Sequence, residues 1–186
     1  MFSITRECFG IKIIIIALMS LVSVNCSKNR SYSAHHNLPY KVARACDKDI
    51  VVAEKRFNLI GVKVITIGQN YLISIPADNL FAQYSPRLRW GSYGLLNDVA
   101  CYLKQFRKVA VNVTAFSSKH ISKQRDKALT LARARAVGNY LETQDIDSRF
   151  IFTEGLGSDK PIVAMKGGGD SSPNSRIEIT FRRQVA

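Results

Sequence analysis

Few side chains in this 186-residue sequence are arranged for catalysis or metal binding. His35 and His36 are adjacent, and neighbouring side chains do not share a helix face, which disfavours a metal site there. His120 is expected in a solvated loop, and the sequence has neither a Gly-x-Ser-x-Gly motif nor a Cys–His pair in a catalytic context. The Gly-rich segment 167–173 lacks the Gly-Lys-Ser/Thr ending of a phosphate-binding loop and is predicted to be a flexible loop. The sequence therefore predicts a protein that is not an enzyme and needs no metal or cofactor.

Cys26 is the residue with the best-defined chemistry, because it closes an apolar run over residues 11–24. The run is too short to cross a bilayer, which takes roughly 20 apolar residues, and its weakly basic start is typical of a secretory signal. A cysteine at the end of such a run predicts lipidation, and Ser27 after it implies sorting to the outer membrane. The residues before Cys26 match the bacterial lipoprotein signal imperfectly. An ordinary secretory signal cleaved nearby is therefore the alternative.

The composition predicts one folded domain with appendages. Hydrophobic residues make up 46% of the chain, which is too many for a disordered sequence. The predicted parts are a signal peptide (1–25), a lipid-anchored linker and N-terminal extension (26–60) and a domain (61–186). Cys46 and Cys101 either pair in an oxidising periplasm or stay unpaired, since buried free cysteines are common.

The charge indicates an anionic partner, because 27 Lys and Arg face 14 Asp and Glu, a formal net charge of +13. Several basic residues share the segment 123–135, which would suit a nucleic-acid binder. A secretory signal argues against that compartment, so no nucleic acid is expected. Peptidoglycan, the inner leaflet of the outer membrane and acidic faces of neighbouring protein subunits are the predicted partners.

Hydrophobic periodicity predicts an α+β fold. The expected elements are strands at 61–68, 71–76, 109–115, 150–153 and 175–181, and helices from about 90 to 106 and from 122 to 142. Their order predicts two layers, a mixed sheet with two main helices packed on one face. Residues 39–60 fit either a short helix or an edge element. The predicted apolar face of the second helix consists of Leu129, Ala132, Ala136, Val137 and Tyr140.

Several short motifs occur in a consistent order. They are Leu80-Phe81, Leu129-Thr-Leu-Ala-Arg-Ala134, Gly155-Leu-Gly157 with Pro161, and Asn174-Ser-Arg-Ile-Glu178. In this order the chain from about Val62 to Phe181 resembles the OmpA C-terminal domain family, which binds peptidoglycan. As a lipoprotein of this length built on such a domain, it also resembles the DotK/IcmN lipoproteins of the Dot/Icm type IVB secretion apparatus.

The resemblance implies a ligand site. Family members hold the diaminopimelate of the peptide stem with an Arg, whose planar fork binds a carboxylate, and an Asp, which accepts from an ammonium. Arg133 matches that Arg, whereas Ser118 stands where the Asp is expected. Asp126, at the position of a family Asn, either supplies the missing charge or is an N-terminal helix residue paired with Lys123 or Arg125. Arg133 itself has an alternative as a surface helix residue with its head in water.

Two functions follow from the resemblance. In the first, the domain is a structural component of an envelope-spanning type IVB secretion complex, on the periplasmic face of the outer membrane, with peptidoglycan binding weakened by Ser118. In the second, it is an anchor that holds diaminopimelate-type stem peptides through Ser118, Asp126 and Arg133. The absent carboxylate favours the first, because hydrogen bonds to charged groups contribute about 1.5–3 kcal/mol and neutral ones about 0.5–1.5 kcal/mol.

Overall fold

The computed structural model describes residues 47–119, 122–146, 148–164 and 169–184. Some predictions fall outside these residues and stay predictions: the signal peptide, lipidation of Cys26, pairing of Cys46 with Cys101, and the surroundings of His35, His36 and His120. Cys101 itself is exposed on helix α4 (Ser92–Lys104).

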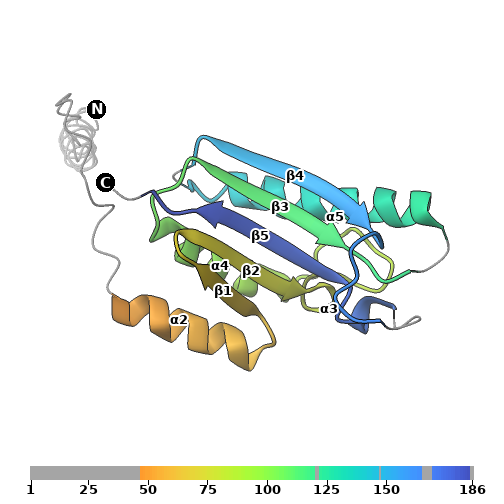
Figure 1. Ribbon diagram of the computed structural model, residues 1–186, viewed down its shortest axis with the longest axis horizontal. Helices are drawn as coiled ribbons and strands as arrows, with labels where there is room; N and C mark the ends of the chain where they lie inside the picture. Colours follow the sequence, from red (N-terminus) through yellow and green to blue (C-terminus); the bar gives the residue numbers. More distant parts are fainter. Residues whose placement is uncertain (1–46, 120–121, 147, 165–168, 185–186) are drawn as a thin grey trace, which may run out of the picture. The chain divides into compact units, whose positions relative to one another are not determined.

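Five strands form one mixed sheet in the order β1-β2-β5-β3-β4 (Figure 1). The strands are β1 Lys63–Ile67, β2 Asn70–Pro76, β3 Ala110–Phe116, β4 Phe150–Gly157 and β5 Arg176–Arg182. Strand β5 pairs antiparallel with both β2 and β3, whereas β3 and β4 pair in parallel. A parallel pair needs a crossover, and helix α5 (Lys123–Glu142) provides it.

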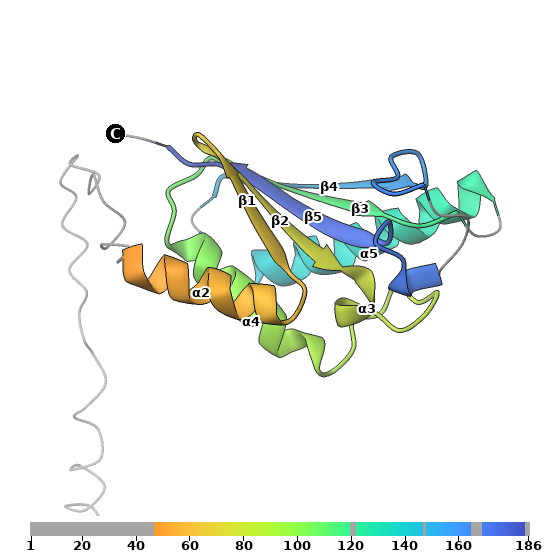
Figure 2. The same cartoon turned by 60° about the horizontal axis from the view of Figure 1, so that its bottom comes forward.

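The helices lie on one face of this sheet, and the other face carries none of the described helices (Figure 2). Besides α5 they are α2 Asp47–Leu59, α3 Ala77–Leu80, α4 Ser92–Lys104 and the short 3₁₀ helix η1 Gly169–Ser171. Side chains alternate along the strands as the pleat requires: Val111 and Val113 are fully buried, while Asn112 between them is exposed. The predicted two-layer α+β fold is confirmed.

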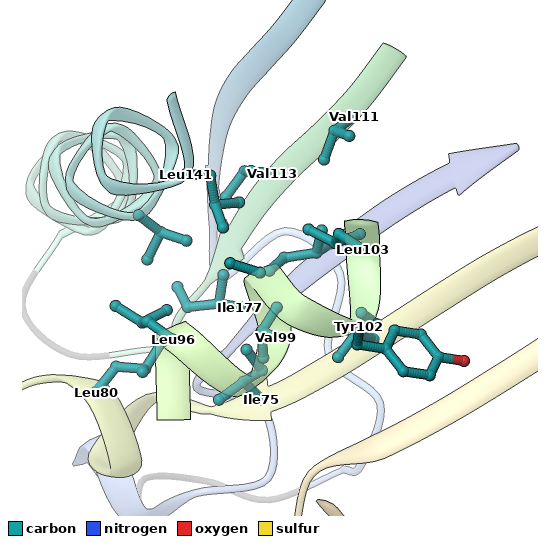
Figure 3. Packing of buried hydrophobic residues seen from close by; sticks show 14 of the residues in the cluster. Ile75, Leu80, Leu96, Val99, Tyr102, Leu103, Val111, Val113, Leu141 and Ile177 are labelled. Atoms are coloured by element: carbon teal, nitrogen blue, oxygen red, sulfur yellow. The ribbon is translucent and has the colours of Figure 1, made fainter. Parts of the chain in front are cut away.

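The core fills the space between the sheet and α4 (Figure 3). Leu96, Val99 and Leu103 of α4 have no exposed surface and lie over Ile75 of β2 and Ile177 of β5. Burying a side chain of this size contributes about 1.5–3 kcal/mol, so α4 is held chiefly by its apolar face. The periodicity that predicted this helix therefore identified its buried side.

Helix α2 belongs to the folded domain. Phe57 is 2% exposed, and its ring meets the ring of Tyr102 edge-on at 5.7 Å. The Tyr102 hydroxyl donates a hydrogen bond of 2.7 Å to Glu54 in the same helix. Of the two alternatives for residues 39–60, the structure contains a helix. The folded part therefore starts before residue 61, where the sequence placed its boundary.

Helix α5 packs on the sheet through a face that overlaps the predicted one only in part. Its buried residues are Asp126, Thr130, Arg133, Ala134, Val137, Gly138 and Leu141, whereas Leu129 and Tyr140 are only half-buried. The predicted Val137 is buried, and Ala136 and Tyr140 pack against the core. The prediction was incomplete because it ranked residues by hydrophobicity, and three polar side chains are also buried here with partners from other segments. The helix also approaches β4 closely, since a Cβ atom on Gly155 would lie 2.2 Å from the backbone nitrogen of Leu131.

Candidate functional site

Arg133 is held inside the domain by a carboxylate of the same chain. Its side chain has no exposed surface, and its two terminal nitrogens lie 2.7 and 2.8 Å from the two carboxylate oxygens of Asp170. Its Nε donates to the carbonyl oxygen of Ser85 at 2.9 Å, and its guanidinium lies 5.1 Å from the centre of the Phe81 ring. This is bidentate recognition of a carboxylate, the strongest geometry available to arginine. The alternative that placed its head in water is wrong.

Asp170 lies in η1, within the segment that was predicted to be a flexible loop. It is 4% exposed, and its Oδ2 also accepts a hydrogen bond of 2.7 Å from the backbone N–H of Tyr84. For residues 169–171 the prediction of a flexible loop is therefore wrong, because Asp170 ties the turn to α5 and to the segment after α3. The residue was missed because a glycine-rich stretch usually carries little structure. Its only signal was that it is the one acidic residue among Gly167–Pro173.

Ser118 holds the same turn from the end of β3. Its side chain is buried, and its Oγ donates to the carbonyl oxygen of Gly169 at 2.8 Å. The backbone N–H of Ser118 donates to Oγ of Ser175 at 2.9 Å, and that hydroxyl also donates to the Gly169 carbonyl. The structure thus brings Ser118 and Arg133 together, since they bind adjacent residues of one turn.

Asp126 occupies the first turn of α5, two turns before Arg133, and is 2% exposed. Oγ of Ser158, after β4, donates to its Oδ2 at 3.4 Å. One of its predicted partners, Lys123, instead forms an ion pair with Asp159 at 3.5 Å. Lys127 joins that pair at 2.9 Å, and its hydrogen bond lowers the pKa of Asp159 below the ordinary value. The acidic group near the helix start that faces these lysines is therefore Asp159.

The site as a whole is a carboxylate receptor that already contains a carboxylate. Arg133 supplies the charge, and Asp170 neutralises it within a turn that Ser118 fastens to the sheet. A groove of about 960 Å³ exists on the domain, but it is lined by residues of β1, β2, β3 and β5 such as Ile67, Leu72 and Arg182, and none of the predicted site residues borders it.

In the described part of the chain, no three His, Cys, Asp or Glu side chains are grouped so that they could hold a metal ion. None of the helices in that part is long and apolar enough to span a membrane.

Fold and site together define the class of this protein. It is a two-layer α+β domain in which an arginine of the crossover helix binds a carboxylate. The OmpA family matches residues 80–175, which is more than half of the sequence, and the chain belongs to this family. It is also 32% identical over 121 residues to the Escherichia coli K12 protein named "Probable lipoprotein YiaD". The matching part is 65% of this chain and 55% of that protein, so the chain spans about half the length of this relative.

Solved structures show the same fold. The cell wall anchor of the T6SS from Pseudomonas aeruginosa superposes with a TM-score of 0.63 at 26% identity, over 73% of this chain and 97% of that one. A MotB-like protein from Desulfovibrio vulgaris superposes with a TM-score of 0.63 at 17% identity, over 74% and 94% of the two chains. At 17% identity, the match to the MotB-like protein shows a shared fold and nothing more.

Proposed function

We propose that this protein is an outer-membrane lipoprotein, anchored through Cys26, whose periplasmic OmpA-like domain is a structural component of an envelope-spanning secretion assembly of the type IVB class. The proposal includes no catalytic activity. Support comes from the family, from the similarity to a lipoprotein and to a cell wall anchor of a secretion system, and from the basic charge. The observation that carries it is the buried pair of Arg133 with Asp170.

The pair argues for a scaffold because a ligand must compete with a group that is already in place. An incoming carboxylate has to displace Asp170, which is held next to Arg133 at high effective concentration. The displaced Asp170 would also leave the N–H of Tyr84 without its acceptor, a loss of about 1–3 kcal/mol if that group stays buried. Ser118 adds no charge for a ligand ammonium. Stem peptides should therefore bind weakly, and the domain should act mainly through protein contacts.

The second candidate is a peptidoglycan anchor, favoured by one observation of the site itself. Arg133 stands at the family position and has the geometry of a carboxylate receptor, so Asp170 can be regarded as an internal stand-in for a ligand. The buried Asp126 would then offer a carboxylate for the ligand ammonium. The 26% identity to a cell wall anchor agrees with this reading.

Removing the internal carboxylate separates the two functions. A chain that begins at Ser27 retains every described core residue, and Asp170→Ala in it opens a carboxylate-sized space beside Arg133. The wild-type and variant domains are titrated with a diaminopimelate-containing stem peptide, and the melting temperature is followed, because a ligand that binds the folded state raises it. The matched control is Asp159→Ala, which removes an exposed ion pair instead.

The scaffold proposal expects no shift for the wild-type domain or the control, and a clear upward shift for Asp170→Ala. Sedimentation with purified peptidoglycan, at low and at physiological salt, is the second measurement. Binding by the wild type that survives physiological salt and disappears in a folded Arg133→Lys variant would contradict the scaffold and establish the anchor. Binding that disappears with salt agrees with a basic scaffold. The proposed lipid anchor is tested by Cys26→Ser, which should release the full chain from the membrane fraction.

A further inference from the structure

The groove of about 960 Å³ lies on the sheet, and side chains from the face opposite the helices line it (Figure 2). In the sheet, Leu72 of β2 is paired with Ile65 of β1 on one side and with Thr180 of β5 on the other. Paired residues of neighbouring strands point to the same side of a sheet. Ile73, next to Leu72, belongs to the core, so the row from Ile65 to Thr180 faces away from the helices.

Apolar side chains form one wall of this groove and remain in contact with water. Ile65 and Ile67 of the edge strand β1 are 47% and 73% exposed. Leu72 beside them is half-buried, and the exposed Val109 lines the groove just before β3. We call Ile65, Ile67 and Leu72 the apolar strip. Exposed apolar side chains that lie next to one another mark surfaces that bind an apolar group.

Two arginines lie at one end of the apolar strip. Arg182, the last residue of β5, and Arg183 line the same groove, and both are exposed. Asn70 is paired with Ile67 on one side and with Arg182 on the other, so these two residues are two strand spacings apart, about 10 Å. The backbone N–H of Arg183 donates to the carbonyl oxygen of Gln69 at 2.8 Å, which fixes the chain after β5. Among the described residues that line the groove none is acidic, so the groove is positively charged.

An apolar strip that ends at two guanidinium groups matches the two parts of an anionic phospholipid. An acyl chain forms no hydrogen bonds and needs only an apolar surface. A phosphate is bound well by the planar fork of arginine, which is also more weakly hydrated than an ammonium group. A free phosphate ion would contact the arginines alone and would leave the apolar strip in water.

The chain also enters the domain at the end where these arginines lie. In both views the start of α2 and the end of β5 are at the same end of the domain (Figures 1 and 2). Residues 27–46, which number 20, separate Cys26 from the first residue of α2. A chain of that length spans at most about 70 Å. A membrane that holds Cys26, as proposed above, therefore stays within reach of the groove.

We propose that this groove binds an anionic phospholipid of that membrane, with an acyl chain along the apolar strip and the phosphate at Arg182 and Arg183. Each arginine near an anionic membrane surface contributes favourably to binding, and the acyl chain covers the exposed side chains of β1. The contact would hold the sheet face of the domain against the membrane. The inference rests on the proposed lipoprotein function, because the lipid anchor supplies the nearby membrane.

A protein partner fits this face less well. Specific protein interfaces cover about 800 Å² on each side and have an apolar centre. Here the centre is polar, because Asn112 of β3 lies between Thr180 of β5 and the exposed Phe152 of β4. A second copy of the chain is disfavoured as well, since the formal net charge of +13 on each copy is repulsive.

Vesicles provide the first test. The domain from Ser27 onward, which lacks the proposed lipid anchor, is sedimented with vesicles of equal parts phosphatidylethanolamine and phosphatidylglycerol, and with vesicles of phosphatidylcholine alone. We expect binding to the anionic vesicles and little binding to the neutral ones. Ile67→Ser should lower the affinity for anionic vesicles roughly tenfold, because the apolar side chain that leaves water is lost. Arg182→Gln/Arg183→Gln should lower it at least roughly tenfold.

Two matched controls separate the groove from general charge and general exposure. Arg125→Gln/Arg135→Gln removes the same charge from exposed positions of α5, on the other side of the sheet. Phe152→Ser removes an exposed apolar side chain from the same face, beyond its polar centre. Both controls should bind anionic vesicles more tightly than the matching groove variant, and Phe152→Ser should equal the wild type.

A short-chain lipid tests for a single bound molecule. Dihexanoyl phosphatidylglycerol, kept below its micelle concentration, should raise the melting temperature of the wild-type domain, because it binds the folded state. Glycerol phosphate, which has the head group without acyl chains, should leave the melting temperature unchanged. Ile67→Ser should remove most of the shift caused by the lipid.

Three results would overturn the inference: equal losses of affinity in the two double arginine variants, equal affinities of Ile67→Ser and Phe152→Ser, or no greater effect of the short-chain lipid than of glycerol phosphate. A single bound acyl chain gives only weak, reversible attachment, so Cys26→Ser should still release the full chain from the membrane fraction. The domain from Ser27 onward does not contain Cys26, and a failure of lipidation would therefore leave these lipid measurements unchanged.

Discussion

The buried ion pair predicts a specific pattern of stabilities. Arg133→Met removes the guanidinium and leaves the carboxylate of Asp170, whose side chain is 4% exposed, buried without its partner. Breaking a buried pair from one side costs about 3–5 kcal/mol, because the remaining charge loses its partner without regaining water. The free energy of unfolding of a domain is about 5–15 kcal/mol, so this single change should remove a large part of it.

The double variant Arg133→Met/Asp170→Asn should recover part of this loss. Without the carboxylate neither charge of this pair remains buried, and the asparagine oxygen can still accept from the N–H of Tyr84. The recovery should be about 0.5–3 kcal/mol, the range expected for residues in direct contact. The control is Arg56→Met, which breaks an ion pair with Asp98 whose side chains are 67% and 49% exposed and should cost less than about 1 kcal/mol.

Urea denaturation followed by far-UV circular dichroism measures these differences. Tryptophan fluorescence is a poor probe of this unfolding transition, because Trp90 is already 91% exposed in the folded domain. The reasoning fails if Arg133→Met costs no more than Arg56→Met. It also fails if the stability lost by the double variant equals the sum of the losses in the two single variants, since the two groups would then not interact.

Three further variants test other parts of the fold, each by urea denaturation. Gly155→Ala should lower the free energy of unfolding by at least about 1–3 kcal/mol, because its methyl group would overlap the backbone of α5. Gly94→Ala, on an open helix face, should leave the free energy of unfolding unchanged or raise it. Equal effects of the two variants would contradict the close packing of Gly155. Ser122→Ala should cost about 0.5–2 kcal/mol, because this side chain caps α5, and an unchanged stability would show that the cap is not formed. Tyr102→Phe should cost about 1.5–3 kcal/mol through the lost hydrogen bond to the carboxylate of Glu54. Burial and this bond raise the pKa of Tyr102 above its ordinary value of 10.0. The hydroxyl therefore contributes fully to stability below pH 10, and its contribution is lost as the pH rises further. Above pH 10 the Tyr102→Phe variant should lose less stability than the wild type.

The sequence by itself determined the elements and their layering. The alternation around Val111 and the three- and four-residue spacing of Leu96, Val99 and Leu103 are local patterns, and each specifies a strand or helix together with its buried side. The order of several short motifs, one of them around Arg133, likewise indicated the family, because each motif reads along a continuous stretch of sequence. The sequence did not identify the packing of α2, whose weak periodicity left residues 39–60 open, since Phe57 acquires its partner Tyr102 only in the folded domain.

The state of the site was decided by tertiary structure alone. Arg133 and Asp170 are 37 residues apart, and nothing local to either one indicates that they meet. The apolar face predicted from hydrophobicity did not include Asp126, Thr130 and Arg133, but they lie on the buried face of α5 because other segments supply partners for them. A charged side chain can be buried only when its partner is in place, and the partner of Arg133 comes from η1, in the segment after β4. The sequence therefore placed the arginine, and the fold determined that a carboxylate of the same chain occupies it.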